Sequence, residues 1–224
     1  MTGDLATSRR AAVDVFLKRN RQKLSATGGR TRLVFALDAT ASRQPTWSIA
    51  RGLQAEMSQE VAKIGGLDVQ LVFFRGRECQ ASRWVSDPAQ LTKMMMQVEC
   101  QTGFTQIGKV LTHARKENLR QKVQALVFVG DAVEEKDTDI YAIARELDSP
   151  AFMFQEGDCP AATTVFREIA RLTNGAHCRF TPGAARELAE LLRAVAAYAA
   201  GGRLALLANK TTAAEKLLLQ LPPR

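Results

Sequence analysis

Short apolar runs alternate with segments of helical periodicity along most of the chain. Each run is four to eight residues long, which is typical of strands covered on both faces of a sheet. A more polar, alternating segment at 78–85 predicts an edge strand. The apolar runs that predict buried strands are 32–37, 67–74, 123–129, 151–154 and 176–180.

Between these runs, apolar residues recur every three or four positions, as on one face of a helix. The clearest example runs from Pro45 to Ile64, where the proline suits a helix start. The other predicted helices are 7–23, the segment carrying Leu91 to Val98, 105–118, 140–147, 161–172 and 183–200. This alternation predicts an α/β fold, with a doubly wound, mostly parallel central sheet and helices on both faces.

The length of 224 residues fits one full-sized domain with extensions. We predict a basic N-terminal helical extension at 1–31, the α/β domain at 32–200 and a leucine-rich helical tail at 201–224. Gly201 and Gly202 mark the second boundary, and the pattern from Thr212 to Glu215 predicts a capping box in the tail.

The net charge of +8 belongs mainly to the ends of the chain. Residues 1–32 hold eight Lys and Arg against two Asp, whereas residues 33–185 are close to neutral. A basic N-terminal helix can meet nucleic acid or an acidic protein surface, or simply form a solvated helix face. The neutral centre favours a protein partner over nucleic acid.

Three features bear on the compartment. The best apolar stretch, Leu188 to Ala200, is too short for a membrane span and is interrupted by Arg193, so we expect no membrane association. The first thirty residues lack the apolar core of a signal peptide, which predicts a cytoplasmic protein. The four cysteines form no C-x-x-C pair, which favours reduced thiols over disulfides or a zinc site.

Hydroxyl and carboxyl side chains follow several of the predicted strands. In a doubly wound sheet, ligands bind outside the carboxyl ends of the strands, so we expect these oxygens to converge there. Oxygen ligands suit a hard ion, Mg²⁺ or Mn²⁺. Because the two aspartates only neutralise a divalent ion, the metal stays attractive to a carboxylate from a partner. The predicted ligands are Asp38, Thr40, Ser42, Thr105 and Asp131.

Three motifs in this order, Asp38-x-Thr40-x-Ser42, Gly103-Phe-Thr105-Gln-Ile-Gly108 and Val129-Gly-Asp131, resemble the von Willebrand factor type A (vWA) domain and its metal-ion-dependent adhesion site (MIDAS). The resemblance covers roughly 32–200. It implies that Thr40 and Ser42 bind the ion directly, and that Asp38, Thr105 and Asp131 complete the shell directly or through water.

The resemblance also implies a stand-alone, intracellular bacterial member that acts as a protein-assembly module rather than an enzyme, beside an ATPase or chaperone-type partner. The chain departs from the family pattern at three places: Thr40 replaces a serine, Phe104 a glycine, and Gly-Asp-Ala replaces Thr-Asp-Gly. None of these changes removes an oxygen donor.

Enzymatic alternatives have less support. A haloacid-dehalogenase phosphatase needs a second acid at the position of Thr40, and a phosphate-binding glycine loop is absent. The two histidines, His113 and His177, fall within a helix and a strand, where we expect structural roles. Glu134 and Glu135, just beyond Asp131, can shape the rim of the site, but a solvated acidic loop is the favoured interpretation. Metal-dependent protein binding is thus the main hypothesis, with nucleic-acid binding through the N-terminal helix second and metal-dependent hydrolysis a distant third.

Overall fold

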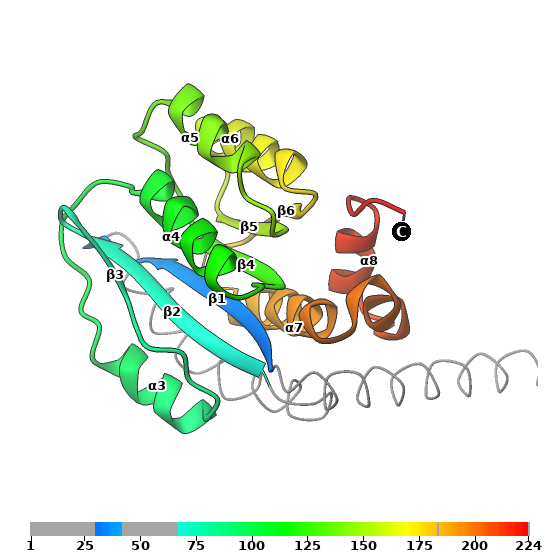
Figure 1. The fold of residues 1–224 in the computed structure, drawn as a ribbon. Coiled ribbons are helices and arrows are strands. Elements are labelled where there is room, and N and C mark those ends of the chain that lie inside the picture. The colour runs from blue at the N-terminus through cyan, green and yellow to red at the C-terminus, as the bar shows by residue number, and fades with distance from the viewer. Residues whose placement is uncertain (1–29, 42–66, 183, 224) are drawn as a thin grey trace, which may run out of the picture.

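The computed structural model describes residues 30–41, 67–182 and 184–223 and has a six-stranded sheet at its centre (Figure 1). The strands lie in the order β3-β2-β1-β4-β5-β6. They are β1 (Thr31–Asp38), β2 (Leu67–Arg75), β3 (Glu78–Ala81), β4 (Ala125–Gly130), β5 (Ala151–Glu156) and β6 (Ala176–Phe180). The described helices are α3 (Pro88–Met96), α4 (Ile107–Arg120), α5 (Asp137–Arg145), α6 (Pro160–Leu172), α7 (Ala185–Ala208) and α8 (Thr212–Leu218).

All neighbouring strands run parallel except β2 and β3, which pair antiparallel as a hairpin. The central strand β1 pairs with β2 on one side and β4 on the other, so the chain changes direction across the sheet at β1. This is the position where doubly wound sheets bind ligands. The predicted fold class, including the edge position of β3, is confirmed.

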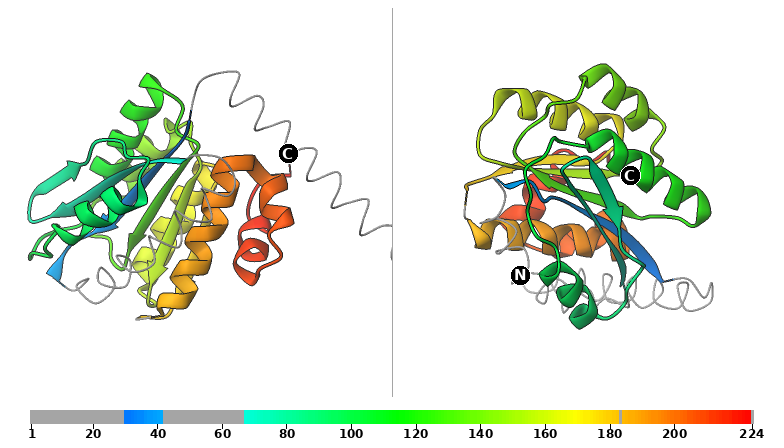
Figure 2. Two further views of the ribbon diagram at one scale, coloured as in Figure 1. Left: turned by 90° about the horizontal axis from the view of Figure 1, so that it is seen from below. Right: turned by 90° about the vertical axis from the view of Figure 1, so that its left-hand side faces the viewer.

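Helices lie on both faces of the sheet (Figure 2), and an apolar layer packs between the strands and the helices on each face. Strand β1 contributes side chains to both layers. Leu33, Phe35 and Leu37 belong to the layer shared with α3, α7 and α8. Val34 and Ala36 belong to the layer shared with α4, α5 and α6. Successive side chains of a strand face opposite sides. A central strand therefore needs the continuous apolar run that the sequence has.

Helix α7 is the one described helix long and apolar enough to cross a membrane by length and composition. Half of its most apolar window is buried in the protein. Leu188, Leu192 and Val195 lie in the core layer against the sheet. The composition of α7 is therefore explained by its packing as a core helix.

The C-terminal tail shares the core of the α/β unit. The predicted boundary at 200/201 lies next to Gly202, whose non-helical backbone (φ 65°) divides α7 into two helical segments. In the tail, Ala213, Leu217 and Leu221 are buried in the layer formed with α7. The helix cap is Thr211 rather than the predicted Thr212, because the Thr211 hydroxyl accepts the Ala214 N–H at 3.1 Å.

Gln220, just after α8, closes the free edge of β6. Its Oε1 accepts the His177 N–H at 2.8 Å and its Nε2 donates to the His177 carbonyl at 2.9 Å. The side-chain amide thereby takes the place of a neighbouring strand. Unpaired edge strands invite pairing with other chains, so this contact also protects the sheet.

We expect Gln220→Ala to lower the free energy of unfolding by about 1–2 kcal/mol, because two hydrogen bonds to the β6 backbone are lost. Urea denaturation measures this change. Leu219→Ala is the matched control, since Leu219 is 87% exposed and its truncation should cost almost nothing. Equal stability of the two variants would show that Gln220 does not hold the tail.

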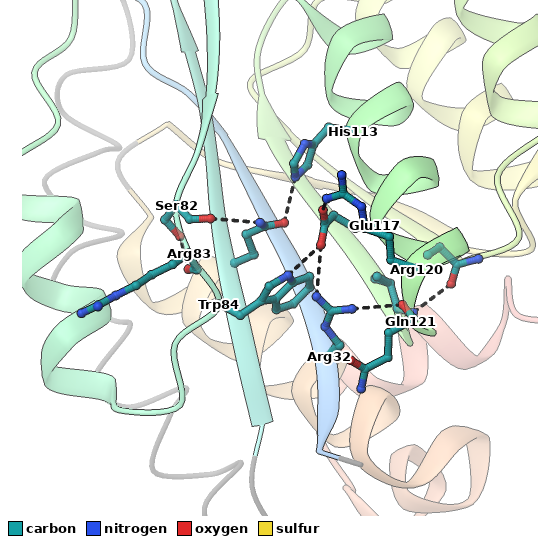
Figure 3. Close-up of polar contacts among 11 residues, drawn as sticks. Arg32, Ser82, Arg83, Trp84, His113, Glu117, Arg120 and Gln121 are labelled. Atoms are coloured by element: carbon teal, nitrogen blue, oxygen red, sulfur yellow. Dashed lines mark hydrogen bonds and ion pairs between the residues drawn. The ribbon is translucent and has the colours of Figure 1, made fainter.

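A buried polar cluster joins α4 to the amino end of β1 (Figure 3). The carboxylate of Glu117 pairs with the Arg32 guanidinium at 3.1 Å and accepts the Trp84 indole N–H at 2.8 Å. It also pairs with Arg120 at 2.6 Å. The Arg32 guanidinium lies 3.6 Å from the centre of the Trp84 ring, a cation–π contact. The cluster lies at the end of β1 away from Asp38.

Both histidines bind glutamine side chains, in keeping with the structural roles predicted for them. His113 Nε2 lies 2.8 Å from Gln70 Oε1, and His177 Nε2 lies 3.0 Å from Gln155 Oε1. Burial lowers the pKa of His177 to about 4, and the charges of Arg167 and Arg179 act in the same direction. His177 is therefore neutral at pH 7.

The four cysteines are free thiols, as predicted. Burial raises the pKa of both Cys79 and Cys178 to about 11, so these two thiols stay protonated and unreactive. The predicted helices at 7–23 and 45–64 lie outside the described residues, as do residues 1–29 of the basic N-terminal extension predicted at 1–31. Its last residue, Thr31, is the first residue of β1.

Candidate metal centre

Four of the five predicted metal ligands line one cavity of about 260 Å³ at the carboxyl ends of β1 and β4. These are Asp38, Thr40, Thr105 and Asp131. The register explains the convergence of the aspartates: Leu37 pairs with Val129, so both strands leave the sheet at nearly the same level. The fifth predicted ligand, Ser42, lies outside the described residues.

Backbone contacts fix the loop after β1. The Thr40 N–H donates to Asp38 Oδ1 at 2.8 Å, which turns the carboxylate back over its own loop. The Ala39 N–H donates to the Phe74 carbonyl, and the Ala39 carbonyl accepts the Gln101 N–H, each at 3.0 Å. Asp38 and Thr40 are both buried. Residues 38–40 of the first motif are therefore held between β2 and the loop that leads to Thr105.

Thr105 and Glu134 bind each other reciprocally. The Thr105 N–H donates to Glu134 Oε2 and the Glu134 N–H donates to Thr105 Oγ1, both at 2.8 Å. The pair ties the loop before α4 to the loop after β4, which carries Asp131. A hydroxyl oxygen has two lone pairs, so Thr105 Oγ1 keeps one for a metal ion.

Glu135 supplies the cap of α4. Its carboxylate accepts the N–H groups of Ile107 and Gly108, the second at 2.9 Å. Burial raises the pKa of the Glu135 carboxyl above its ordinary value of 4.5, although the two N–H groups oppose this shift. The residue before α4, Gln106, makes no side-chain cap, so the acceptor comes from another loop.

The interpretation of Glu134 and Glu135 as a solvated acidic loop holds only in part: Glu134 is exposed, but it also lines the cavity, as the alternative predicted. Both carboxylates are used by backbone N–H groups at the start of α4. The helix itself begins at Ile107 rather than at the predicted Thr105, since the Thr105 hydroxyl accepts a hydrogen bond from the next loop. In the sequence, Thr105 itself suits a helix cap, so no local signal indicated that Glu135 caps this helix.

The donor set fits a hard divalent ion. All four side chains offer oxygen, and none offers nitrogen or sulfur. In the described part of the chain, no three His, Cys, Asp or Glu side chains gather closely enough to hold a metal. Any ion in this cavity thus needs the threonine hydroxyls as well as the aspartates.

Comparisons with solved structures address the fold. A von Willebrand factor type A protein from Catenulispora acidiphila matches with a TM-score of 0.63 and 16% identity, over 77% of this chain and 43% of that chain. An aerotolerance-related membrane protein from Bacteroides fragilis matches with a TM-score of 0.57 and 17% identity, over 73% and 96%.

A third similar structure is proximal thread matrix protein 1 from the mussel byssus, with a zinc-occupied MIDAS motif. Its TM-score is 0.58 and its identity 17%, over 77% of this chain and 46% of that chain. The chain thus spans less than half the length of the first and third of these proteins. No protein-family model and no curated protein matches the sequence.

The sheet order and the cavity at its centre define an open, doubly wound α/β domain. The chain has, more particularly, the fold of the von Willebrand factor type A domain. The resemblance seen in the three sequence motifs is confirmed for the fold. The stand-alone bacterial character stays a prediction.

Proposed function

We propose that the chain is a protein-interaction module that holds a divalent ion, Mg²⁺ or Mn²⁺, and uses it to capture a carboxylate of another protein. The observation that carries this proposal is the convergence of Asp38, Thr40, Thr105 and Asp131 on one cavity. The ion would supply the electrostatic attraction, and these side chains would hold it. Binding of this kind requires no nucleophile, so we expect no enzymatic activity.

The structural neighbours support the same proposal. One of them holds zinc in a MIDAS motif, which favours a divalent ion here. The zinc in that protein does not determine which metal this chain prefers. We propose Mg²⁺ or Mn²⁺ here, because these ions suit a set of ligands made up of oxygen atoms alone.

Glu134 alters the charge balance deduced from the sequence. It adds a third carboxylate to the cavity lining, and its Oε2 accepts the Thr105 N–H. A partner carboxylate is therefore repelled on the Glu134 side. We infer that it approaches the ion from the side of the loop at Thr102 and Gly103, which also lines the cavity.

We expect Thr105→Ala to weaken partner binding about tenfold or more, because one oxygen donor to the ion is removed. The fold should persist, since Thr105 lies in a loop outside the strands and helices. The measurement is co-purification of the partner with the tagged protein, with and without EDTA. Thr105→Ser keeps the hydroxyl and should restore most of the binding.

Thr112→Ala is the matched control. Thr112 lies on α4 outside the cavity, and its hydroxyl donates to the Gly108 carbonyl at 2.7 Å. The control should bind like the wild type. Capture of the same partner in EDTA, or unchanged affinity after amidation of the partner's acidic residues, would contradict the proposal.

A further inference from the structure

An exposed aromatic residue stands in the chain between the cavity-lining residues Gly103 and Thr105. Phe104 directly precedes the predicted ligand Thr105, and it is 64% exposed. Among the described residues, it is the only aromatic residue in the set of large apolar side chains exposed to solvent. Aromatic side chains beside a binding cavity are frequent anchors in protein interfaces.

The turn between β2 and β3 packs directly against the loop that carries Phe104. A Cβ added to Gly103 would lie 2.2 Å from the Gly76 nitrogen, so the two backbones meet only because Gly103 lacks a side chain. Gly76 has a φ of 56°, which favours glycine at the turn as well. The sequence thus brings the hairpin turn next to the cavity-lining loop.

Hydrogen bonds then fix this contact. Gln106 Nε2 donates to the carbonyls of Gly76 and Glu78 at 3.3 and 3.1 Å, and the Phe104 N–H donates to the Gly76 carbonyl at 3.4 Å. Lys109 Nζ donates to the Arg77 carbonyl at 2.9 Å. The turn and the loop therefore form one preorganised surface, which reduces the entropic cost of binding.

The turn that packs against the cavity-lining loop carries an arginine. Arg77 is exposed at the turn, and no carboxylate within the described ranges forms an ion pair with its guanidinium. Arginine binds carboxylates in a bidentate geometry. The charge therefore complements an acidic group on a bound segment.

We propose that Phe104 and Arg77 form a specificity rim that selects one kind of partner segment. That segment carries an apolar side chain for Phe104 and a second carboxylate for Arg77, within a few residues of the carboxylate that reaches the metal. The inference rests on the proposed metal-dependent function. It adds a chemical description of the partner.

The test is selection of random twelve-residue peptides displayed on phage, on the full chain with Mg²⁺, with elution by EDTA. The wild type should enrich peptides with two acidic residues and a neighbouring apolar residue. Peptides selected on Arg77→Glu should no longer share a second acidic residue. Peptides selected on Phe104→Ala should no longer share an apolar residue beside the acid. Lys210→Glu and Leu119→Ala change exposed residues of other segments and should select like the wild type.

A synthetic peptide from the wild-type selection provides a second readout. Arg77→Glu should weaken its binding about three- to tenfold, and replacing the peptide's second acid by lysine should recover the loss. Arg77→Glu and Phe104→Ala should both keep the wild-type melting temperature, because the side chains of Arg77 and Phe104 are exposed.

Two negative outcomes are distinguishable. The proposed specificity rim is wrong if the EDTA-eluted peptides share only a single acidic residue, with no apolar residue preferred beside it. It is also wrong if Arg77→Glu and Phe104→Ala select the same peptides as the wild type. Either result is compatible with the proposed metal-dependent binding. Failure to recover any EDTA-eluted peptide would overturn the metal-dependent function, and the rim with it.

Discussion

Replacing Glu117 by alanine should lower the free energy of unfolding by about 3–5 kcal/mol. The side chains of Arg32 and Glu117 are only 8% and 7% exposed, so the variant leaves a buried guanidinium without its carboxylate. The Trp84 indole N–H loses its acceptor as well. Urea denaturation at pH 7 measures the effect.

Glu146→Ala is the matched control, because Glu146 pairs with Arg115 between side chains that are 60% and 41% exposed. Such a surface pair is worth less than about 1 kcal/mol. Equal losses in the two variants would contradict the role of the buried cluster in anchoring α4.

The Glu117 contribution also depends on pH. Burial raises the pKa of its carboxyl, but hydrogen bonds from Trp84 and Arg120 outweigh burial and hold the pKa below its ordinary value of 4.5. A group with a lowered pKa in the folded state stabilises the protein above its unfolded pKa and loses that effect as the pH falls through the folded value. The stability gap between wild type and Glu117→Gln should therefore narrow below pH 4.5.

Asp38→Ala should abolish stabilisation by divalent ions. In the wild type, Mg²⁺ or Mn²⁺ at a hundredfold excess over its Kd adds about 2.7 kcal/mol, which raises the melting temperature by roughly 5–10 °C for a chain of this size. Without Asp38 the cavity keeps one predicted carboxylate ligand, Asp131, and should no longer bind the ion. Thermal unfolding with and without metal measures the difference.

Two further variants control for the loss of a buried side chain. Asp38→Asn keeps the acceptor for the Thr40 N–H and should still lose the metal response. Asp148→Ala removes a carboxylate that pairs with Lys122 outside the cavity and should respond like the wild type. A melting temperature that rises equally in all variants would place metal binding elsewhere.

The strands were predictable from sequence within about two residues, apart from the shorter β3. Buried parallel strands are continuous apolar runs that end abruptly in polar residues, as β1 does at Asp38. Three of the predicted ligands, Asp38, Thr40 and Asp131, lie at or just after the ends of β1 and β4, so their convergence on one cavity was predictable for the same reason. Thr105 instead precedes α4. The edge strand β3 is shorter than its alternating pattern indicated, and only Val85 continues the pairing, as a bridge to Val69.

Contacts between distant segments were not predictable. Glu135 caps α4 from 27 positions away, and Arg32 pairs with Glu117 across 85 positions. No local pattern of residue types carries such information. By contrast, the predicted break at Gly201 and Gly202 is a local signal, and Gly202 has the non-helical backbone (φ 65°) that separates the two segments of α7.

Calorimetric titration of the metal-free protein with Mn²⁺ tests most directly the claim that these oxygens hold a metal ion. We predict one bound ion per chain in the wild type, weaker binding in Thr105→Ala, and no binding at this site in Asp38→Ala. Identical stoichiometry and affinity in all three proteins, or no binding in the wild type, would contradict the account.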